Sequence, residues 1–278
     1  MTDTYAPRHD QDAAILSDTP SAEADVPFTY RKIAPPRAAL LPLELRVLAE
    51  GAALAAAWPA LNRAPDGDGH GVVVVPGFTA DDASMAPMRR FIANRGYVAH
   101  GWDNGRNMGA TQANLDAVVA KLEAVADETG RKVSLIGWSL GGCFVREVAR
   151  ECPELVRQVM TLGSPFQDVR ANAISTMLQM FAPEDVIEDP EREKTLGSPI
   201  PVPSTAIFTP TDAIVAGDAC RECPGGQRES IEVFASHMGL AYNPLVYFAI
   251  ADRLAQAEKR WRHFEPPALL RQLYAVHK

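Results

Sequence analysis

The sequence predicts an α/β fold, in which a mostly parallel, twisted sheet carries helices on both faces. From residue 71 onward, short apolar runs alternate with segments whose apolar residues recur at helical spacing, which is typical of βαβ units. Residues 71–75 form a fully apolar run, Gly-Val-Val-Val-Val, that ends at Pro-Gly. Such a run is typical of a strand buried on both faces of a sheet. Together these two observations predict that helices cover the sheet on both sides.

Length and composition exclude several classes of protein. A chain of 278 residues is long enough for one α/β domain, and 47% hydrophobic with 22% charged residues fits neither a disordered chain nor a membrane bundle. The 27 basic and 35 acidic residues give a net charge of −8, which repels the phosphates of nucleic acids. The first residues show no secretory signal. We therefore expect a cytoplasmic protein without a nucleic-acid partner.

The chain divides into three predicted parts. Residues 1–30 contain few large apolar side chains and predict a flexible arm. Residues 31–70 predict an amphipathic helical segment. Residues 71–278 predict the α/β domain itself. A short cap or lid is expected within this domain at about 167–202, where two strands are separated by more residues than a crossover needs.

The most apolar stretch of the chain runs from residue 38 to residue 61. It contains Glu44, Arg46 and Glu50, so we expect no membrane-spanning helix there. We expect an amphipathic helix instead, either packed on the domain or in peripheral contact with a membrane. Its predicted apolar face is formed by Leu45, Leu48, Ala52 and Leu54.

Within the domain, the predicted strands and helices alternate along the chain. The helical pattern is clearest for residues 111–129, where Gly130 provides the stop signal. A last helix is predicted from the Asn243-Pro244 cap to about Ala257. The predicted strands are 71–75, 97–101, 132–136, 159–162, 205–208 and 231–234, and the other predicted helices are 84–95 and the segment that follows Ser139.

A catalytic motif occurs at Gly137-Trp138-Ser139-Leu140-Gly141, which matches G-x-S-x-G. It lies between a predicted strand and a predicted helix, which is the position of a nucleophile elbow. A sharp turn there presents the hydroxyl of Ser139 at the carboxyl edge of the sheet, and the two glycines prevent clashes with the neighbouring backbone. The following helix points its amino terminus at the reacting centre, where the helix dipole favours a negative oxygen. Ser139 is therefore the predicted nucleophile.

A serine nucleophile needs a base, and the base needs a carboxylate that orients it. Asp212 and His237 each follow a predicted strand directly, so both are expected at the same edge of the sheet as Ser139. The chain order of serine, acid and histidine agrees with that of a nucleophile-elbow enzyme. Asp218 remains an alternative for the acid, and His263 remains an alternative for the base.

An oxyanion hole needs two backbone N–H groups that point at the developing negative oxygen. Leu140, which follows the predicted nucleophile, is expected to supply one of them. Phe78, in the loop after strand 71–75, is expected to supply the other, because Gly77 lets the chain turn closely at that point.

At these residues the sequence resembles the α/β-hydrolase family, and in particular its bacterial lipase/esterase-like branch. The resemblance extends over about residues 71–256, and it implies an eight-stranded, mostly parallel sheet and hydrolysis through an acyl-enzyme without a cofactor. It also implies that Ser139, Asp212 and His237 form the catalytic triad. The matching segments are Gly137-Trp-Ser-Leu-Gly-Gly142, Thr161-Leu-Gly-Ser-Pro165, Asp212-Ala-Ile-Val215 and Ser236-His-Met-Gly-Leu240. Many lipases carry His-Gly at the oxyanion turn, whereas this sequence carries Pro76-Gly77.

We therefore expect a serine ester hydrolase that acts on a small-molecule ester with a neutral, largely apolar acyl group. Two alternatives remain open: an acyltransferase that uses the same three residues, and a non-catalytic binding module on a hydrolase scaffold. Flexible thioethers and aromatic rings suit an apolar acyl pocket. The predicted pocket residues are Met108, Trp138, Met177, Met180, Phe181 and Met238.

The four cysteines are not expected to form a metal site. Cys220 and Cys223 have CxxC spacing, but no second pair of cysteine or histidine ligands lies near them. We expect a pair of loop thiols, with zinc binding and redox chemistry as alternatives. Cys143 and Cys152 lie in a helical pattern and are expected to be small core residues.

Overall fold

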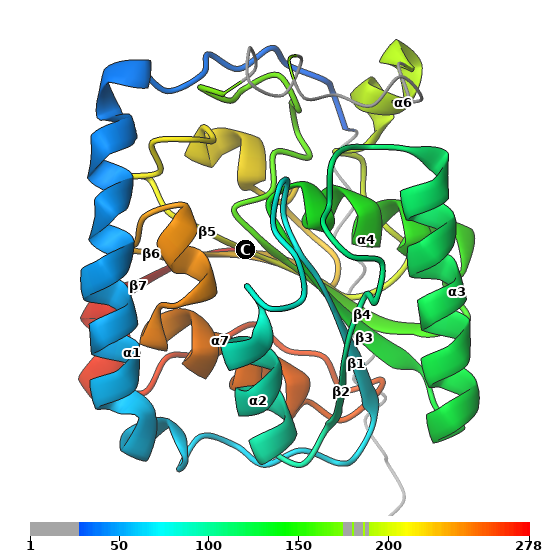
Figure 1. The fold of residues 1–278 in the computed structure, drawn as a ribbon. Coiled ribbons are helices and arrows are strands. Elements are labelled where there is room, and N and C mark those ends of the chain that lie inside the picture. The colour runs from blue at the N-terminus through cyan, green and yellow to red at the C-terminus, as the bar shows by residue number, and fades with distance from the viewer. Residues whose placement is uncertain (1–27, 175–179, 181–185, 187–188) are drawn as a thin grey trace, which may run out of the picture.

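The structure is a computed structural model, and it describes residues 28–174, 180, 186 and 189–278. Seven strands form one sheet in the order β2-β1-β3-β4-β5-β6-β7 (Figure 1). Neighbouring strands are parallel except for β7, which pairs antiparallel with β6. The strands are β1 (Gly71–Val75), β2 (Val98–Gly101), β3 (Val133–Trp138), β4 (Val156–Leu162), β5 (Ser204–Phe208), β6 (Arg228–Val233) and β7 (Tyr274–His277).

Helices cover both faces of this sheet, as the sequence predicts (Figure 1). One face is covered by α1 (Val47–Leu61), α2 (Ala86–Asn94) and α7 (Pro244–Leu254). The other face is covered by α3 (Gln112–Thr129) and α4 (Leu140–Glu151). The fold is therefore a three-layer α/β arrangement with the parallel strands at its centre.

Strand β1 shows why a continuous apolar run is needed at the centre of the sheet. Val72 and Val74 point into the core under α1, α2 and α7. Val73 and Val75 point into the core under α3 and α4. All four side chains are completely buried, because successive residues of a strand face opposite sides of the sheet.

The clearest predicted helix is confirmed at both ends. The Thr111 side chain accepts a hydrogen bond from the Asn114 amide at 3.1 Å, which caps the amino terminus of α3. Gly130 ends α3 with a φ of 62°, a left-handed conformation that favours glycine. The last helix, α7, begins at Pro244 after the Asn243 cap, as predicted, but it ends at Leu254 rather than near Ala257.

The amino-terminal segment differs from its prediction. A 3₁₀-helix, η1 (Ala38–Arg46), precedes α1, and Leu45 and Leu48 are 71% and 75% exposed. Of the four residues of the predicted apolar face, only Leu54 is buried. The two helix types have different periods, so one regular apolar face does not continue through Arg46. Glu44 is buried instead, with 9% of its surface exposed.

The sheet also differs from the eight strands that the family resemblance implies. Seven strands are present in the described part of the chain, and residues 28–70 contain none of them. The predicted strands overlap β1 to β6, although β4 and β6 each begin three residues before the predicted start, and β7 is not among the predicted strands. It is a four-residue strand at the edge of the sheet, where a short apolar pattern is weak.

The predicted insertion at 167–202 is described only in part. Its residues 172–174 run beside the loop after β5, where the Ala173 amide donates to the Ile214 carbonyl at 2.7 Å. A short helix, α6 (Pro190–Thr195), follows later in the insertion. Within the described ranges, none of the helices has both the length and the apolar character needed to cross a membrane. The predicted flexible arm lies almost entirely outside the described residues.

Candidate active site

Ser139 lies at the sharp turn between β3 and α4. Its φ of 52° and ψ of −122° are unusual for a residue other than glycine, as expected of a strained elbow. The adjoining glycines make the turn possible. A Cβ atom at Gly137 would meet the backbone of Gly141 and Gly142, and one at Gly141 would lie 2.5 Å from the Val75 carbonyl oxygen.

The structure brings Ser139, His237 and Asp212 together. The Ser139 Oγ atom lies 3.0 Å from Nε2 of His237, and Nδ1 of His237 lies 2.7 Å from an Asp212 carboxylate oxygen. The other carboxylate oxygen accepts hydrogen bonds from the Ile214 and Val215 amides at 2.8 Å and 2.7 Å. Asp212 is thus held in one orientation, and it can orient the histidine ring in turn.

His237 is buried, and its charge balance makes it a stronger base than an exposed histidine. Burial disfavours the charged ring and by itself lowers the pKa. The Asp212 carboxylate and its hydrogen bond act in the opposite direction and outweigh burial, and the Glu44 carboxylate adds to their effect. The pKa of His237 is therefore raised above its usual value. A ring of this kind can accept a proton from the Ser139 hydroxyl.

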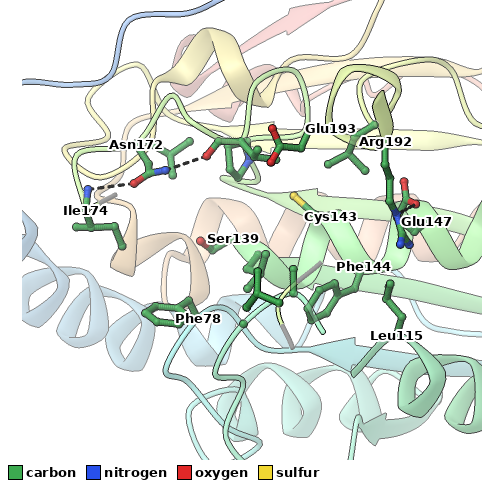
Figure 2. Close-up of a pocket in the computed structure, with 18 of the residues that line it drawn as sticks. Phe78, Leu115, Ser139, Cys143, Phe144, Glu147, Asn172, Ile174, Arg192 and Glu193 are labelled. Atoms are coloured by element: carbon green, nitrogen blue, oxygen red, sulfur yellow. Dashed lines mark hydrogen bonds and ion pairs between the residues drawn. The ribbon is translucent and has the colours of Figure 1, made fainter. Parts of the chain in front are cut away.

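The two amides predicted for an oxyanion hole border the same site. Leu140 is the first residue of α4, so its amide has no acceptor within the helix. Phe78 lies in the loop after β1 and lines the cavity together with Ser139 (Figure 2). The buried Asn107 holds this loop, because its side-chain amide donates to the Pro76 carbonyl at 2.9 Å and its main-chain carbonyl accepts from the Thr79 amide at 2.6 Å.

A cavity of about 320 Å³ opens beside Ser139. Figure 2 shows Phe78 and Ser139 at one end of this cavity and Glu147 at the other. One wall is a face of α4 whose residues recur at helical spacing: Leu140, Cys143, Phe144 and Glu147. The opposite wall comes from the insertion and the loop after β5, and includes Val169, Asn172, Ile174, Leu196, Ile214 and Val215.

Charged groups are paired at the end of the cavity away from Ser139. The Arg192 Nε atom donates to the Glu147 carboxylate at 2.7 Å, which joins α6 to α4. Glu193 forms an ion pair with Arg170, with a nitrogen–oxygen distance of 2.8 Å. The charged groups at this end are therefore already paired, and the volume next to Ser139 is mainly apolar.

The predicted pocket residues have different positions. Met108 lines the cavity. Trp138 does not, because it is buried at the end of β3, where its indole N–H donates to the His237 carbonyl at 3.2 Å. Met180 and Met238 are 72% and 37% exposed, and neither lines the cavity. The remaining two, Met177 and Phe181, lie outside the described residues.

The rival candidates lie elsewhere. Asp218 is exposed and pairs with Arg221 at 3.5 Å. His263 lies 3.6 Å from Glu229, a residue near the start of β6 and therefore at the opposite edge of the sheet from Ser139. Cys220 and Cys223 are both unbridged. In the parts of the chain that are described, no cluster of three or more potential metal ligands occurs.

Two residues of this site were not predicted from the sequence. Asn107 lies in an Asn/Gly-rich segment that suggests an ordinary turn, and only its contacts with Pro76 and Thr79 reveal its role. Glu44 lies in an apolar stretch, where an acidic residue suggests a solvent-facing position. The buried carboxylate in fact accepts hydrogen bonds from the loops that carry Asp212 and His237. No local sequence signal distinguishes either residue from its neighbours.

Comparison with known proteins gives one family match and several structural matches. The family model described as palmitoyl protein thioesterase matches residues 71–195. No curated relative matches the sequence. A structure from a study of LipS and LipT, two metagenome-derived lipolytic enzymes, matches with a TM-score of 0.51 and 18% identity, over 68% of this chain and 93% of the other.

Two further solved structures have similar scores. A Bacillus licheniformis lipase in its mature form has a TM-score of 0.51 and 16% identity, over 70% of this chain and 95% of its own. A Paleococcus ferrophilus monoacylglycerol lipase has a TM-score of 0.50 and 14% identity, over 67% of this chain and 96% of its own. At these identities the matches concern the fold, which all three structures share with this chain.

Proposed function

We propose that this chain, which has the α/β-hydrolase fold, is a serine hydrolase that cleaves carboxylic esters through an acyl-enzyme. One observation carries this proposal: Ser139, His237 and Asp212 are connected by hydrogen bonds, and Ser139 lines an apolar cavity. Fold membership alone does not define an activity, so the proposal rests on this geometry.

The first half of the proposed reaction forms the acyl-enzyme. The Ser139 oxygen attacks the carbonyl carbon of the ester while Nε2 of His237 takes the hydroxyl proton. The Phe78 and Leu140 amides donate hydrogen bonds to the oxygen that becomes negative. The carbon–oxygen bond to the alcohol then breaks, and His237 gives its proton to the departing alkoxide. Asp212 keeps the ring in the tautomer that both transfers need.

The second half releases the acid. Water attacks the acyl carbon and gives a proton to His237, and the same two amides again bind the negative oxygen. The bond to Ser139 breaks, the serine oxygen takes the proton from His237, and a carboxylic acid leaves. This acid ionises in neutral solution, and the net charge of −8 favours departure of an anion over its capture.

The cavity supports a neutral, apolar acyl group as the substrate class. Its volume of about 320 Å³ lies at the lower end of small-molecule sites, and its wall along α4 is formed largely by Leu140, Cys143 and Phe144. Burying an apolar chain there is favourable by roughly 25 cal/mol for each Å² removed from water. Arg192 lines the cavity but is already paired with Glu147, so among the described residues an anionic acyl chain would lose its hydration without gaining a free cation.

A series of p-nitrophenyl esters of increasing acyl length tests the proposal. We expect turnover by the natural chain, and we expect Ser139→Ala to remove it. Substantial activity in Ser139→Ala would overturn the assignment. Failure of a fluorophosphonate to label Ser139 in the natural chain would favour a non-catalytic binding module instead. Ester products formed with an added alcohol would indicate acyl transfer.

Thioester hydrolysis is a second candidate, because the family model that matches residues 71–195 is described as palmitoyl protein thioesterase. The same acyl-enzyme forms from an ester or a thioester, since only the leaving group differs. Comparing kcat/KM for an ester and a thioester with the same acyl group separates the two candidates. A preference for the thioester of about 100-fold or more would favour this second function.

A further inference from the structure

Three charged side chains of the amino-terminal segment 38–61 point toward the candidate active site. They are Glu44 and Arg46 on η1 and Glu50 on α1. Glu44 and Arg46 make hydrogen bonds to the main chain of both loops that follow β5 and β6, and Glu50 bonds to the loop after β6. These contacts connect residues that are more than 160 positions apart in the sequence, so they are purely tertiary.

The contacts of Glu44 link the two loops to each other. One carboxylate oxygen accepts from the Ala213 amide at 3.0 Å, and the other accepts from the Met238 amide at 2.9 Å. Ala213 directly follows Asp212, and Met238 directly follows His237. A single buried carboxylate therefore joins the residues next to the proposed acid and the proposed base.

Arg46 and Glu50 hold the residues on the other side of the same pair. Arg46 donates to the Thr211 carbonyl at 2.9 Å and to the Ala235 carbonyl at 3.2 Å. Glu50 accepts from the Ser236 amide at 2.7 Å and from the Ser236 hydroxyl at 2.5 Å. Thr211 directly precedes Asp212, and Ser236 directly precedes His237. Both triad members are thus held on each side.

This arrangement explains why the segment buries Glu44 while Leu45 and Leu48 are exposed. The loops direct backbone N–H and C=O groups at the segment, and such groups are costly to bury without partners. Charged partners make hydrogen bonds that are shorter and stronger than neutral ones. Apolar side chains on the same helical face would leave these loop groups unsatisfied.

We propose that Glu44, Arg46 and Glu50 are positioning residues that hold the loops of Asp212 and His237 in register with Ser139. The proposal rests on the proposed function, because it assigns a role in that reaction. It makes the segment 38–61 part of the active-site framework. None of the three residues touches the reacting atoms, and each acts through the loop that it holds.

Glu44 has an additional electrostatic effect on His237. The carboxylates of Asp212 and Glu44 both favour the charged ring, and burial opposes them. Arg46 faces the same loops but directs its guanidinium to carbonyl oxygens, and Glu50 directs its carboxylate to Ser236. Removing the charge of Glu44 therefore lowers the pKa of His237 toward its ordinary value.

Glu44→Gln tests the proposal in the full-length chain. The amide NH₂ group cannot accept a hydrogen bond, so one of the two loop amides loses its partner while the size of the side chain is kept. We expect kcat for p-nitrophenyl butyrate to fall by about 10-fold to 100-fold with KM nearly unchanged, and we expect the acid limb of the pH profile to move to lower pH. Glu123→Gln, on the exposed face of α3, is the control with the same change of charge, and we expect natural activity.

Arg46→Lys is the second variant, because Arg46 is only half-buried and its replacement by lysine keeps the charge. A single ammonium group does not reproduce the planar fork that reaches both Thr211 and Ala235, so kcat should again fall while the thermal unfolding midpoint changes little. The proposal would be overturned if Glu44→Gln and Arg46→Lys both kept the natural kcat, measured per folded molecule, and the natural pH profile. Loss of the proposed function is a separate result, since it requires that the natural chain lack Ser139-dependent turnover.

Discussion

The Nε2 atom of His70 lies 2.8 Å from the hydroxyl of Ser134, and Nδ1 of the same ring lies 2.5 Å from Asp68. The same order of groups occurs at Ser139 and His237, but His70 and Ser134 lie at the amino-terminal edge of the sheet. Both are completely buried, and neither lines the cavity beside Ser139. Three residues in the correct contacts therefore do not by themselves make an active site, because a substrate must also reach the hydroxyl.

Replacing each of the two serines should separate stability from activity. Ser134→Ala removes a hydroxyl that contacts His70 and accepts from Gln158, so we expect a loss of about 1–3 kcal/mol in the free energy of unfolding with natural kcat. Ser139→Ala should do the reverse and lower kcat by at least roughly 10⁴-fold with little loss of stability. Urea unfolding and p-nitrophenyl butyrate turnover measure the two quantities. Equal losses of kcat in both variants would contradict this division of roles.

The stability of the chain should decrease as the pH falls from about 6.5 to about 4. Burial of His70 disfavours its charged form and, with the Arg157 and Arg131 charges, outweighs Asp68 and lowers the pKa to about 4. Within this range the unfolded chain binds a proton that the native chain does not, so acid favours unfolding. Urea unfolding at a series of pH values measures the effect. The decrease should be smaller in His70→Gln, and an equal decrease would exclude His70 as its source.

Activity should also be lost on the acid side, because of His237. The base must be neutral to accept the Ser139 proton, and its pKa is raised above the usual value. We therefore expect the acid limb of kcat/KM to lie above about pH 6.5. An acid limb below pH 6 in the natural chain would contradict the raised pKa.

Asp212→Asn should lower kcat by roughly 10⁴-fold, since an amide stabilises the wrong tautomer of His237.

Asn107→Ala should weaken binding of the transition state more than binding of the substrate. The variant loses the hydrogen bond to Pro76 that holds the loop of Phe78. Because a poorly placed oxyanion donor costs catalysis, we expect kcat to fall about 10-fold to 100-fold with a smaller change in KM. Asn104→Ala is the matched control, since Asn104 is exposed in the same segment and contacts only Asn114 in the hydrogen bonds described. Equal effects of the two changes would argue against a role for Asn107 in the oxyanion hole.

Cys143→Phe should shift the substrate preference toward shorter acyl groups. Cys143 lies one turn after Ser139 on α4 and lines the cavity, so a larger side chain reduces the space for the acyl chain. Burial raises the pKa of the Cys143 thiol to about 12, which keeps it neutral rather than a second nucleophile. Cys143→Ser preserves the volume and should keep the natural preference. The kcat/KM values over a series of p-nitrophenyl esters measure the shift, and an unchanged series in Cys143→Phe would show that the acyl chain does not pass this residue.

The central fold was predictable because its signals are local. The five-residue apolar strand from Gly71 to Val75, the capped helix from Thr111 to Gly130 and the glycine-flanked turn at Ser139 each depend on residues close in sequence. The positions of Asp212 and His237 followed from the same logic, because parallel strands end at one edge of the sheet. Strand β7 was missed, since its four residues pair only after the chain has folded back onto β6.

Local sequence patterns are enough to predict the alternation of strands and helices, the elbow at Ser139, and the order of the serine, acid and histidine. The inward orientation of Glu44, and the exposure of Leu45 and Leu48, follow only from contacts made in the folded chain. Hydrophobic periodicity assumes that the buried face of a helix meets apolar side chains. Here that face meets the main-chain amides of two distant loops, and these groups require hydrogen-bond acceptors. Such a requirement is created by the folded chain, so no local pattern in the sequence carries it.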